Sequence, residues 1–325
     1  MTRHTLSVSA CGKTAIAVMA LSIVLLGSGR ASATQLYATS ISGNEIYQVD
    51  TVGNTVTPYL NTVYAADSVM FDSSQNVIYT RINQGEVRLY NPNSAIDSLI
   101  AGGFTGPADI ALEPGGGTML VSEFYGGRID RINLTTHVVT TLLTTVGSGP
   151  EGLAYDGSRL FANLGVRSTG AQKYVAEIDP VTGAILAQSP LLSSLDGLTY
   201  DPYSGRLFAS SVFGNTVYEF DPNNLNNVQD LSLKLGSIPG PDGITTDGIG
   251  NIFVASTGAP DGYVYQIDLI GQTLTQKQYV PGLDDLAPAS GLGSGTVPEP
   301  LTMFAVGMGI AGLGGYIRRR LRPAK

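Results

Sequence analysis

The chain is 325 residues long, 43% hydrophobic and only 14% charged, with 41 glycines, one cysteine and two histidines. Eight of its 18 Lys and Arg residues lie in residues 1–33 and 301–325, which contain no acid, so the middle carries 10 bases against all 26 acids. So acidic a body repels a phosphate backbone, which argues against nucleic acid as a partner. A middle with no cysteine and one histidine excludes Cys/His zinc sites, disulfide scaffolds and cysteine nucleophiles, so a metal there would be an oxygen-liganded cation such as calcium.

The first 33 residues have the pattern of a secretory signal peptide. Arg3 and Lys13 precede an apolar run over residues 15–26, and Ala31-Ser32-Ala33 supplies small residues for a cleavage site. A retained anchor would need about 20 apolar residues, more than this run provides. We therefore expect residues 1–33 to be removed and the mature chain to begin at Thr34.

The middle of the chain consists of six repeats, each with two recurring phrases. The first phrase opens at positions 41 to 46 residues apart, and the second is a strand with an aromatic or apolar centre. The first phrase occurs at Asp67-Ser68-Val69, Ala108-Asp109-Ile110, Glu151-Gly152-Leu153, Asp196-Gly197-Leu198, Asp242-Gly243-Ile244 and Asp284-Asp285-Leu286. Between them, period-two runs of Val, Ile, Leu, Tyr and Phe alternate with Gly, Pro, Asn and Asp, which are strand and turn signals.

A repeat in the low forties with about four strands per unit is typical of a β-propeller, and six units predict six blades over residues 34–290. The mature chain opens on a second phrase at Leu36, whereas the last unit ends on a first phrase at Asp284. We therefore expect an all-β six-bladed propeller, closed by pairing of its N- and C-terminal strands, because closure removes two unpaired edges. Residues 291–300 have the composition of a linker and end in a short motif.

The C-terminal end combines three parts in order. Val297, Pro298, Glu299 and Pro300 form the short motif, residues 301–317 an uncharged stretch that can just span a bilayer, and residues 318–325 a basic tail with Arg318, Arg319 and Arg320. The basic cluster predicts a cytoplasmic end. This arrangement resembles the PEP-CTERM sorting tail of exported bacterial proteins. The resemblance implies transient inner-membrane anchoring, processing by an exosortase-type enzyme, and delivery to the cell surface or extracellular matrix.

The position that opens the first phrase predicts an acidic ring around the propeller axis. Innermost strands run beside the central channel, so equivalent residues face one another across it. The ring is Asp67, Ala108, Glu151, Asp196, Asp242 and Asp284. Two interpretations stay open: a divalent cation relieves the repulsion between these carboxylates, or each Asp is a turn residue that accepts backbone hydrogen bonds.

The blades resemble those of NHL-type and gluconolactonase-like propellers, the latter including the senescence marker protein family. This resemblance implies a divalent cation at the channel mouth. Asp242, in Pro241-Asp242-Gly243, matches the family's metal-binding Asp, which is also its general base. Asp196 stands where the family has Asn, Asp67 stands near the family's early Glu, and Glu151 lines the same mouth. The implied calcium ligands are Asp67, Glu151, Asp196 and Asp242.

Two functions follow from these observations. The first is a non-enzymatic cell-surface or matrix protein whose acidic face binds a polysaccharide, another surface protein or a cation. The second is a calcium-dependent lactonase or hydrolase with Asp242 as the base. They differ in whether the carboxylates converge within coordination distance of one point.

Overall fold

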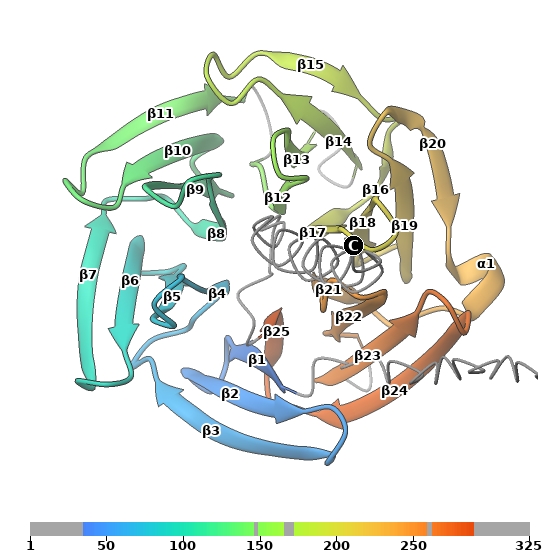
Figure 1. Cartoon of the computed structure of the whole chain (residues 1–325), viewed down its shortest axis with the longest axis horizontal. Coiled ribbons are helices and arrows are strands. Elements are labelled where there is room, and N and C mark those ends of the chain that lie inside the picture. Colours follow the sequence, from blue (N-terminus) through green and yellow to red (C-terminus); the bar gives the residue numbers. More distant parts are fainter. Residues whose placement is uncertain (1–34, 146–148, 166–171, 259–261, 289–325) are drawn as a thin grey trace, which may run out of the picture. The chain divides into compact units, whose positions relative to one another are not determined.

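The computed structural model describes residues 35–145, 149–165, 172–258 and 262–288. Within these ranges the strands form six antiparallel sheets, arranged around a central axis as the blades of a propeller (Figure 1). The prediction of a six-bladed β-propeller is confirmed.

Each blade has four main strands, which we call the first to the fourth strand from the axis outward. Blade 1 contains β25 (Leu283–Pro288), β1 (Gln35–Ser40), β2 (Glu45–Asp50) and β3 (Thr55–Asn61). Blade 2 contains β4 (Val69–Phe71), β5 (Val77–Arg81), β6 (Glu86–Asn91) and β7 (Ile96–Gly102). Blade 3 contains β8 (Pro107–Leu112), β9 (Thr118–Glu123), β10 (Arg128–Asn133) and β11 (Val139–Thr144).

The other three blades repeat this order. Blade 4 contains β12 (Leu153–Tyr155), β13 (Leu160–Gly165), β14 (Gln172–Ile178) and β15 (Ile185–Gln188), and the short β16 (Leu192–Ser193) also pairs with β14. Blade 5 contains β17 (Leu195–Asp201), β18 (Arg206–Ser211), β19 (Thr216–Asp221) and β20 (Asn224–Asp230). Blade 6 contains β21 (Pro241–Thr246), β22 (Asn251–Ser256), β23 (Tyr263–Asp268) and β24 (Thr273–Tyr279).

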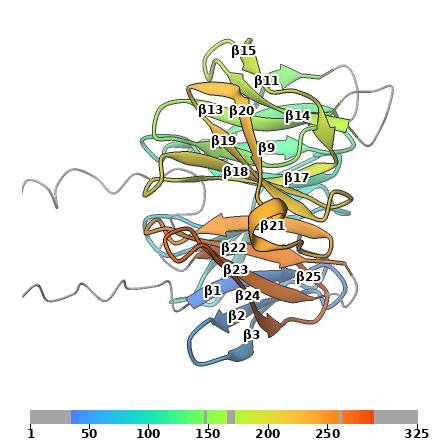
Figure 2. The same ribbon diagram turned by 90° about the vertical axis from the view of Figure 1, so that its right-hand side faces the viewer.

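Blade 1 closes the ring, because its strands come from both ends of the described chain. The last strand, β25, pairs antiparallel with the first, β1, so that Leu36 lies opposite Pro288 and Ser40 opposite Leu283 (Figure 2). The predicted closure is therefore confirmed. The inner edge of β1, which would otherwise be unpaired, is thereby covered by β25.

Aspartates at the ends of the third strands close the turns to the fourth strands. In blade 1 the Asp50 Oδ1 atom accepts hydrogen bonds from the backbone N–H groups of Val52 (2.9 Å) and Gly53 (2.8 Å). In blade 6 the Asp268 Oδ1 atom accepts from Ile270 and Gly271 in the same way. An Asp or Asn at the end of the third strand of a repeat thus indicates a turn that its side chain stabilises.

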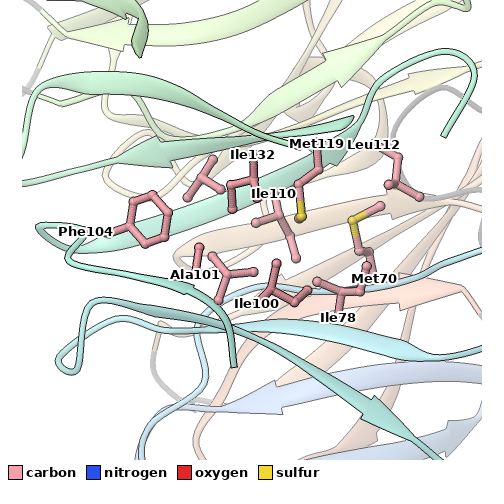
Figure 3. Packing of buried hydrophobic residues seen from close by; sticks show 11 residues of the cluster. Met70, Ile78, Ile100, Ala101, Phe104, Ile110, Leu112, Met119 and Ile132 are labelled. Atoms are coloured by element: carbon pink, nitrogen blue, oxygen red, sulfur yellow. The ribbon is translucent and has the colours of Figure 1, made fainter. Parts of the chain in front are cut away.

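The hydrophobic core lies between blades, since each sheet packs both faces against its neighbours. Figure 3 shows the cluster between blades 2 and 3, in which Met70 and Ile78 meet Ile110 and Met119. Every residue of β5 and of β22 is buried. This burial on both faces explains why the second strand of each repeat is a continuous apolar phrase.

Two features lie beyond the predicted strands. A four-residue helix, α1 (Ser232–Leu235), follows β20, where no helix was expected. The predicted signal peptide, sorting motif, membrane span and basic tail fall outside the described residues. Within the described ranges, no helix has the length and hydrophobicity needed to cross a membrane.

Candidate functional site: an acidic cup on the propeller axis

In blades 1, 3, 5 and 6 the acidic positions lie on β-bulges in the inner strands, whereas Asp67 and Glu151 lie just before the inner strands of blades 2 and 4. The pairing register shifts by one residue in β25, β8, β17 and β21 at the same place in each strand. In blade 5, for example, Leu195 pairs with Ser211 and Leu198 with Ala209, so Asp196 and Gly197 together face one residue of β18. A bulge of this kind redirects side chains. In blade 5 it presents Asp196 to the channel.

Hydroxyl groups on the second strands fix the bulges and join them to the next blade. The Ser210 Oγ atom accepts a hydrogen bond from the Gly197 N–H (2.9 Å) and donates to the Asp242 carbonyl of blade 6. At the closing seam, Thr39 Oγ1 accepts from the Asp285 N–H (2.8 Å) and donates to the Asp67 carbonyl of blade 2 (2.6 Å). These hydroxyls therefore set the positions of the ring residues relative to each other.

Glycine follows the ring residue in blades 4, 5 and 6 because the inner strands approach too closely for a side chain. A Cβ atom on Gly152 would lie 2.4 Å from the Leu198 nitrogen, and one on Gly197 would lie 2.8 Å from the Asp242 carbonyl oxygen. Both distances are below normal contact. The Asp-Gly and Glu-Gly pairs thus meet a packing requirement between blades as well as a local backbone preference.

The six ring positions line a single small cavity on the axis, which we call the cup. Its volume is about 70 Å³. Beneath the acidic ring, each blade contributes one branched aliphatic side chain that is at most 6% exposed: Val69, Ile110, Leu153, Leu198, Ile244 and Leu286. These side chains give the acidic ring an apolar floor.

Four of the ring aspartates form two hydrogen-bonded pairs across blade boundaries, Asp67 with Asp284 and Asp196 with Asp242. Two carboxyl groups can share a hydrogen bond only if one of them holds a proton. Burial raises the pKa of all four carboxyls, and the charge of Asp196 raises the pKa of Asp242 further. Their remaining exposure is to the cup, which has room for water.

Glu151, the only ring glutamate, has a different partner. Its carboxylate forms an ion pair with the Nζ atom of Lys173, which projects from β14 and is 4% exposed. Burial lowers the pKa of Lys173, while the charges of Asp196 and Asp242 oppose that shift. The amine lies over the ring of Phe124, 5.6 Å from its centroid. The carboxylates of the ring thus hold a cation supplied by the chain itself.

Two further carboxyls line the cup at the second bulge position, where blades 4 to 6 have glycine. Asp109 accepts hydrogen bonds from the Ser68 hydroxyl (2.9 Å) and the Leu153 N–H (2.7 Å), and burial raises its pKa to about 6. Burial and the neighbouring charge of Asp109 raise the pKa of Asp285. Neither residue was predicted from the sequence, although the position is Ser, Asp, Gly, Gly, Gly, Asp around the repeats.

The two interpretations of the ring aspartates can now be compared with their contacts. Asp109, which follows the ring position Ala108 in blade 3, behaves partly as a local backbone acceptor, since its Oδ1 atom also accepts from the Ile110 N–H (2.7 Å). Asp67, Asp196 and Asp242 instead pair with carboxyls of neighbouring blades. Turn chemistry alone therefore does not account for the ring.

The predicted calcium ligands Asp67, Glu151, Asp196 and Asp242 all line the cup, and each of them is paired with another side chain. Asp67 bonds Asp284, Glu151 binds Lys173, and Asp196 bonds Asp242. Over the described part of the chain, no group of three or more His, Cys, Asp or Glu side chains is arranged to hold a metal ion. In this arrangement each of the four side chains is bonded to another group, and the calcium site and the role of Asp242 as a base stay predictions.

Comparisons with known proteins agree on the fold and differ on function. The sequence matches no known family profile and no curated protein. The crystal structure of a nidogen/laminin complex contains a similar chain, with a TM-score of 0.66 and 18% identity, covering 78% of this chain and 97% of that chain.

Two bacterial structures are also similar. Virginiamycin B lyase from Staphylococcus aureus has a TM-score of 0.52 and 16% identity, covering 76% of this chain and 85% of that chain. TolB from Acinetobacter baumannii has a TM-score of 0.58 and 16% identity, covering 78% of this chain and 66% of that chain. At these identities the similarity shows the six-bladed β-propeller fold alone. Evidence that distinguishes binding from catalysis must therefore come from the residues of the cup.

Proposed function

We propose that the protein is an exported bacterial cell-surface or extracellular-matrix propeller that acts by binding and not by catalysis. The observation that carries this proposal is the small volume of the cup together with the pairing of its carboxyl groups. Its volume of about 70 Å³ is far below the roughly 300–1,000 Å³ of typical small-molecule sites. Four of its aspartates are hydrogen-bonded in pairs, Asp67 with Asp284 and Asp196 with Asp242, and Glu151 is paired with Lys173. A catalytic base needs a free carboxylate within reach of a bound substrate.

The export route rests on the sequence of the two ends. Residues 1–33 supply the signal peptide, Val297-Pro298-Glu299-Pro300 the processing motif, and residues 301–325 the span and basic cluster. In this proposal an exosortase-type enzyme releases the propeller from the inner membrane. Surface polymers and surface proteins are then its available partners. The extended acidic body, which repels nucleic acid, suits such a location.

The test is to express the full chain in a bacterium that carries an exosortase and to separate inner membrane, outer surface and medium. We expect a shortened form at the surface or in the medium. A variant with Pro298→Ala, Glu299→Ala and Pro300→Ala should accumulate at full mature length in the inner membrane. Cytoplasmic accumulation of the unaltered chain, with residues 1–33 still attached, would refute the proposal.

A further inference from the structure

Exposed apolar side chains stand on three of the turns between the second and third strands of the blades. Phe213, on the turn between β18 and β19, is 74% exposed, and Tyr125, between β9 and β10, is 68% exposed. Ile41 occupies the matching turn between β1 and β2 and is 40% exposed. Exposed aromatic residues on rigid turns are frequent anchors in interfaces.

These turns lie on the same side of the propeller as the acidic ring. The ring residues sit where the inner strands begin, and those ends pair with the ends of the second strands: Pro107 with Glu123, Leu195 with Ser211 and Leu283 with Ser40. The turns that carry Tyr125, Phe213 and Ile41 follow directly. We call this side, with the cup at its centre, the mouth face.

The two ends of the described propeller lie on the other side. Leu36 pairs with Pro288, so these residues lie at the end of blade 1 that is remote from the Ser40–Leu283 pair and from the neighbouring Asp284, which lines the cup. Thirty-seven residues follow Pro288 in the sequence. The described chain therefore begins and ends on the side opposite the mouth face.

The cup has strong charge asymmetry. Among the described residues that line it, none is Lys or Arg. Seven carboxyl side chains line it: Asp67, Asp109, Glu151, Asp196, Asp242, Asp284 and Asp285. Lys173 neutralises the blade 4 side through Glu151, whereas within the described ranges no base pairs with Asp67 or Asp284 on the opposite side. A further cation therefore finds complementary charge there, and a displaced shared proton would leave a carboxylate to receive it.

We propose that the mouth face docks an extended segment of another protein, with one Lys or Arg side chain entering the cup. A single ammonium or guanidinium group suits a cavity of this volume, and Tyr125, Phe213 and Ile41 pack against the residues that flank it. This inference rests on the proposed binding function and names its partner class.

The test uses the purified full chain in detergent and an array of heptapeptide pools. Each pool is random except for a fixed central residue, which is Lys, Arg, Gln or Glu. At low ionic strength we expect the Lys or Arg pool to bind at least tenfold more protein than the Gln pool, and the Glu pool to bind least. The excess should fall as NaCl is raised, because charge attraction is screened.

Variants locate the binding face. Phe213→Ala and Tyr125→Ala should each reduce binding to the Lys and Arg pools at least threefold. Tyr203→Ala is the matched control, since Tyr203 is 53% exposed but lies on the turn between β17 and β18, at the other end of the inner strand. Asp67→Asn and Asp284→Asn should reduce the preference for a central cation without unfolding the protein, as shown by unchanged circular dichroism.

Three results would overturn the inference. These are equal binding of the Gln and Lys pools, equal loss in Tyr203→Ala and Phe213→Ala, or retention on an acidic surface polysaccharide with no peptide preference. Any of them would leave the proposed function intact if the chain still reaches the surface. Failure of export, by contrast, would remove the proposed function whatever the peptide array shows.

Discussion

Glycine residues of the inner-strand bulges determine how closely the blades approach each other at the cup. Gly152 faces the backbone of blade 5, and Gly197 faces the backbone of blade 6. In the other half of the ring the same position holds Ser68, Asp109 and Asp285, which form hydrogen bonds there. One residue position thus divides the ring into a tightly packed half and a polar half.

Replacing Gly152 with Ala should destabilise the propeller by about 2–4 kcal/mol, because the new methyl group would contact the Leu198 nitrogen and force blades 4 and 5 apart. The measurement is the free energy of unfolding in urea. Gly117→Ala is the control, since a Cβ there meets no atom within 4 Å. Similar losses in both variants would contradict the close approach of the bulges.

Asp242 shows how a ring carboxyl affects stability. Its burial and the charge of Asp196 raise its pKa, so ionising it at neutral pH costs free energy. Asp242→Asn keeps a side chain of the same size that can donate a hydrogen bond to Asp196. We expect it to raise stability at pH 7.5 by about 1–2 kcal/mol, or about 2–4 °C in Tm.

Calorimetry at pH 7.5 and at pH 4.5 checks this expectation. At the lower pH the advantage of Asn should shrink, because Asp242 then holds its proton in the folded protein. An Asn variant that is less stable at both values would show that an ionised Asp242 is needed, as a cation site would require.

At the scale of the elements, the second strand of each blade does more than fill the core. In β1 the Thr39 hydroxyl joins the bulge of β25 to the carbonyl of Asp67 in blade 2. In β18 the Ser210 hydroxyl does the same between blades 5 and 6. In β13 the Asn163 amide reaches the carbonyl of Asp196 (2.6 Å). Each link crosses a blade boundary.

Thr39→Val should reduce stability by about 1–3 kcal/mol, because Val has nearly the same shape but leaves the Asp285 N–H and the Asp67 carbonyl without this partner. Urea unfolding of the full chain measures the change. Thr57→Val, at an exposed position of β3, provides the comparison. If Thr39→Val were no more harmful than Thr57→Val, the closing seam would not depend on this hydroxyl.

The blades could be predicted from the sequence because each repeat contains one strand pattern that the fold requires. A continuous apolar second strand, an Asp at the end of the third and a spacing of 41 to 46 residues are local signals, and they determine the blade number and the closing strand. The ring positions followed from the repeat register. Asp109 and Asp285 were missed because a bulge, which is not visible in the spacing, places two consecutive side chains at the cup.

The pairing of side chains within the cup could not be predicted from the sequence either. Lys173 lies on β14, two strands away from β12 in the blade, and no motif links it to Glu151. Whether four acids converge on one point or pair off depends on small differences in distance between blades. The repeat fixes only the order of the blades around the axis.

For the whole molecule, the raised pKa values predict that stability falls as pH rises from about 4 through 7. The folded protein holds protons on the cup carboxyls that the unfolded chain releases near an ordinary Asp pKa of 3.8, and Asp109 releases its proton only at about 6. The exposed turn residues Asp50, Asp179 and Asp221 have lowered pKa values and act in the opposite sense, below this window.

We therefore expect a higher Tm at pH 5 than at pH 7.5, by several degrees, in differential scanning calorimetry of the full chain. Asp67→Asn combined with Asp242→Asn should flatten the profile between these two values. A Tm that rises steadily from pH 5 to pH 7.5 would mean that the cup carboxyls are ionised and stabilised in the folded protein.

In our proposal the propeller encloses a proton-sharing acidic cup for a cationic side chain, and it is not a calcium-dependent hydrolase. The most direct measurement is the Tm of the full chain in detergent, at pH 7.5, with calcium from micromolar to millimolar concentration and with EDTA. We predict a Tm that does not change with calcium. A saturable rise in Tm that disappears when Asp196 and Asp242 are replaced by Ala would contradict the proposal.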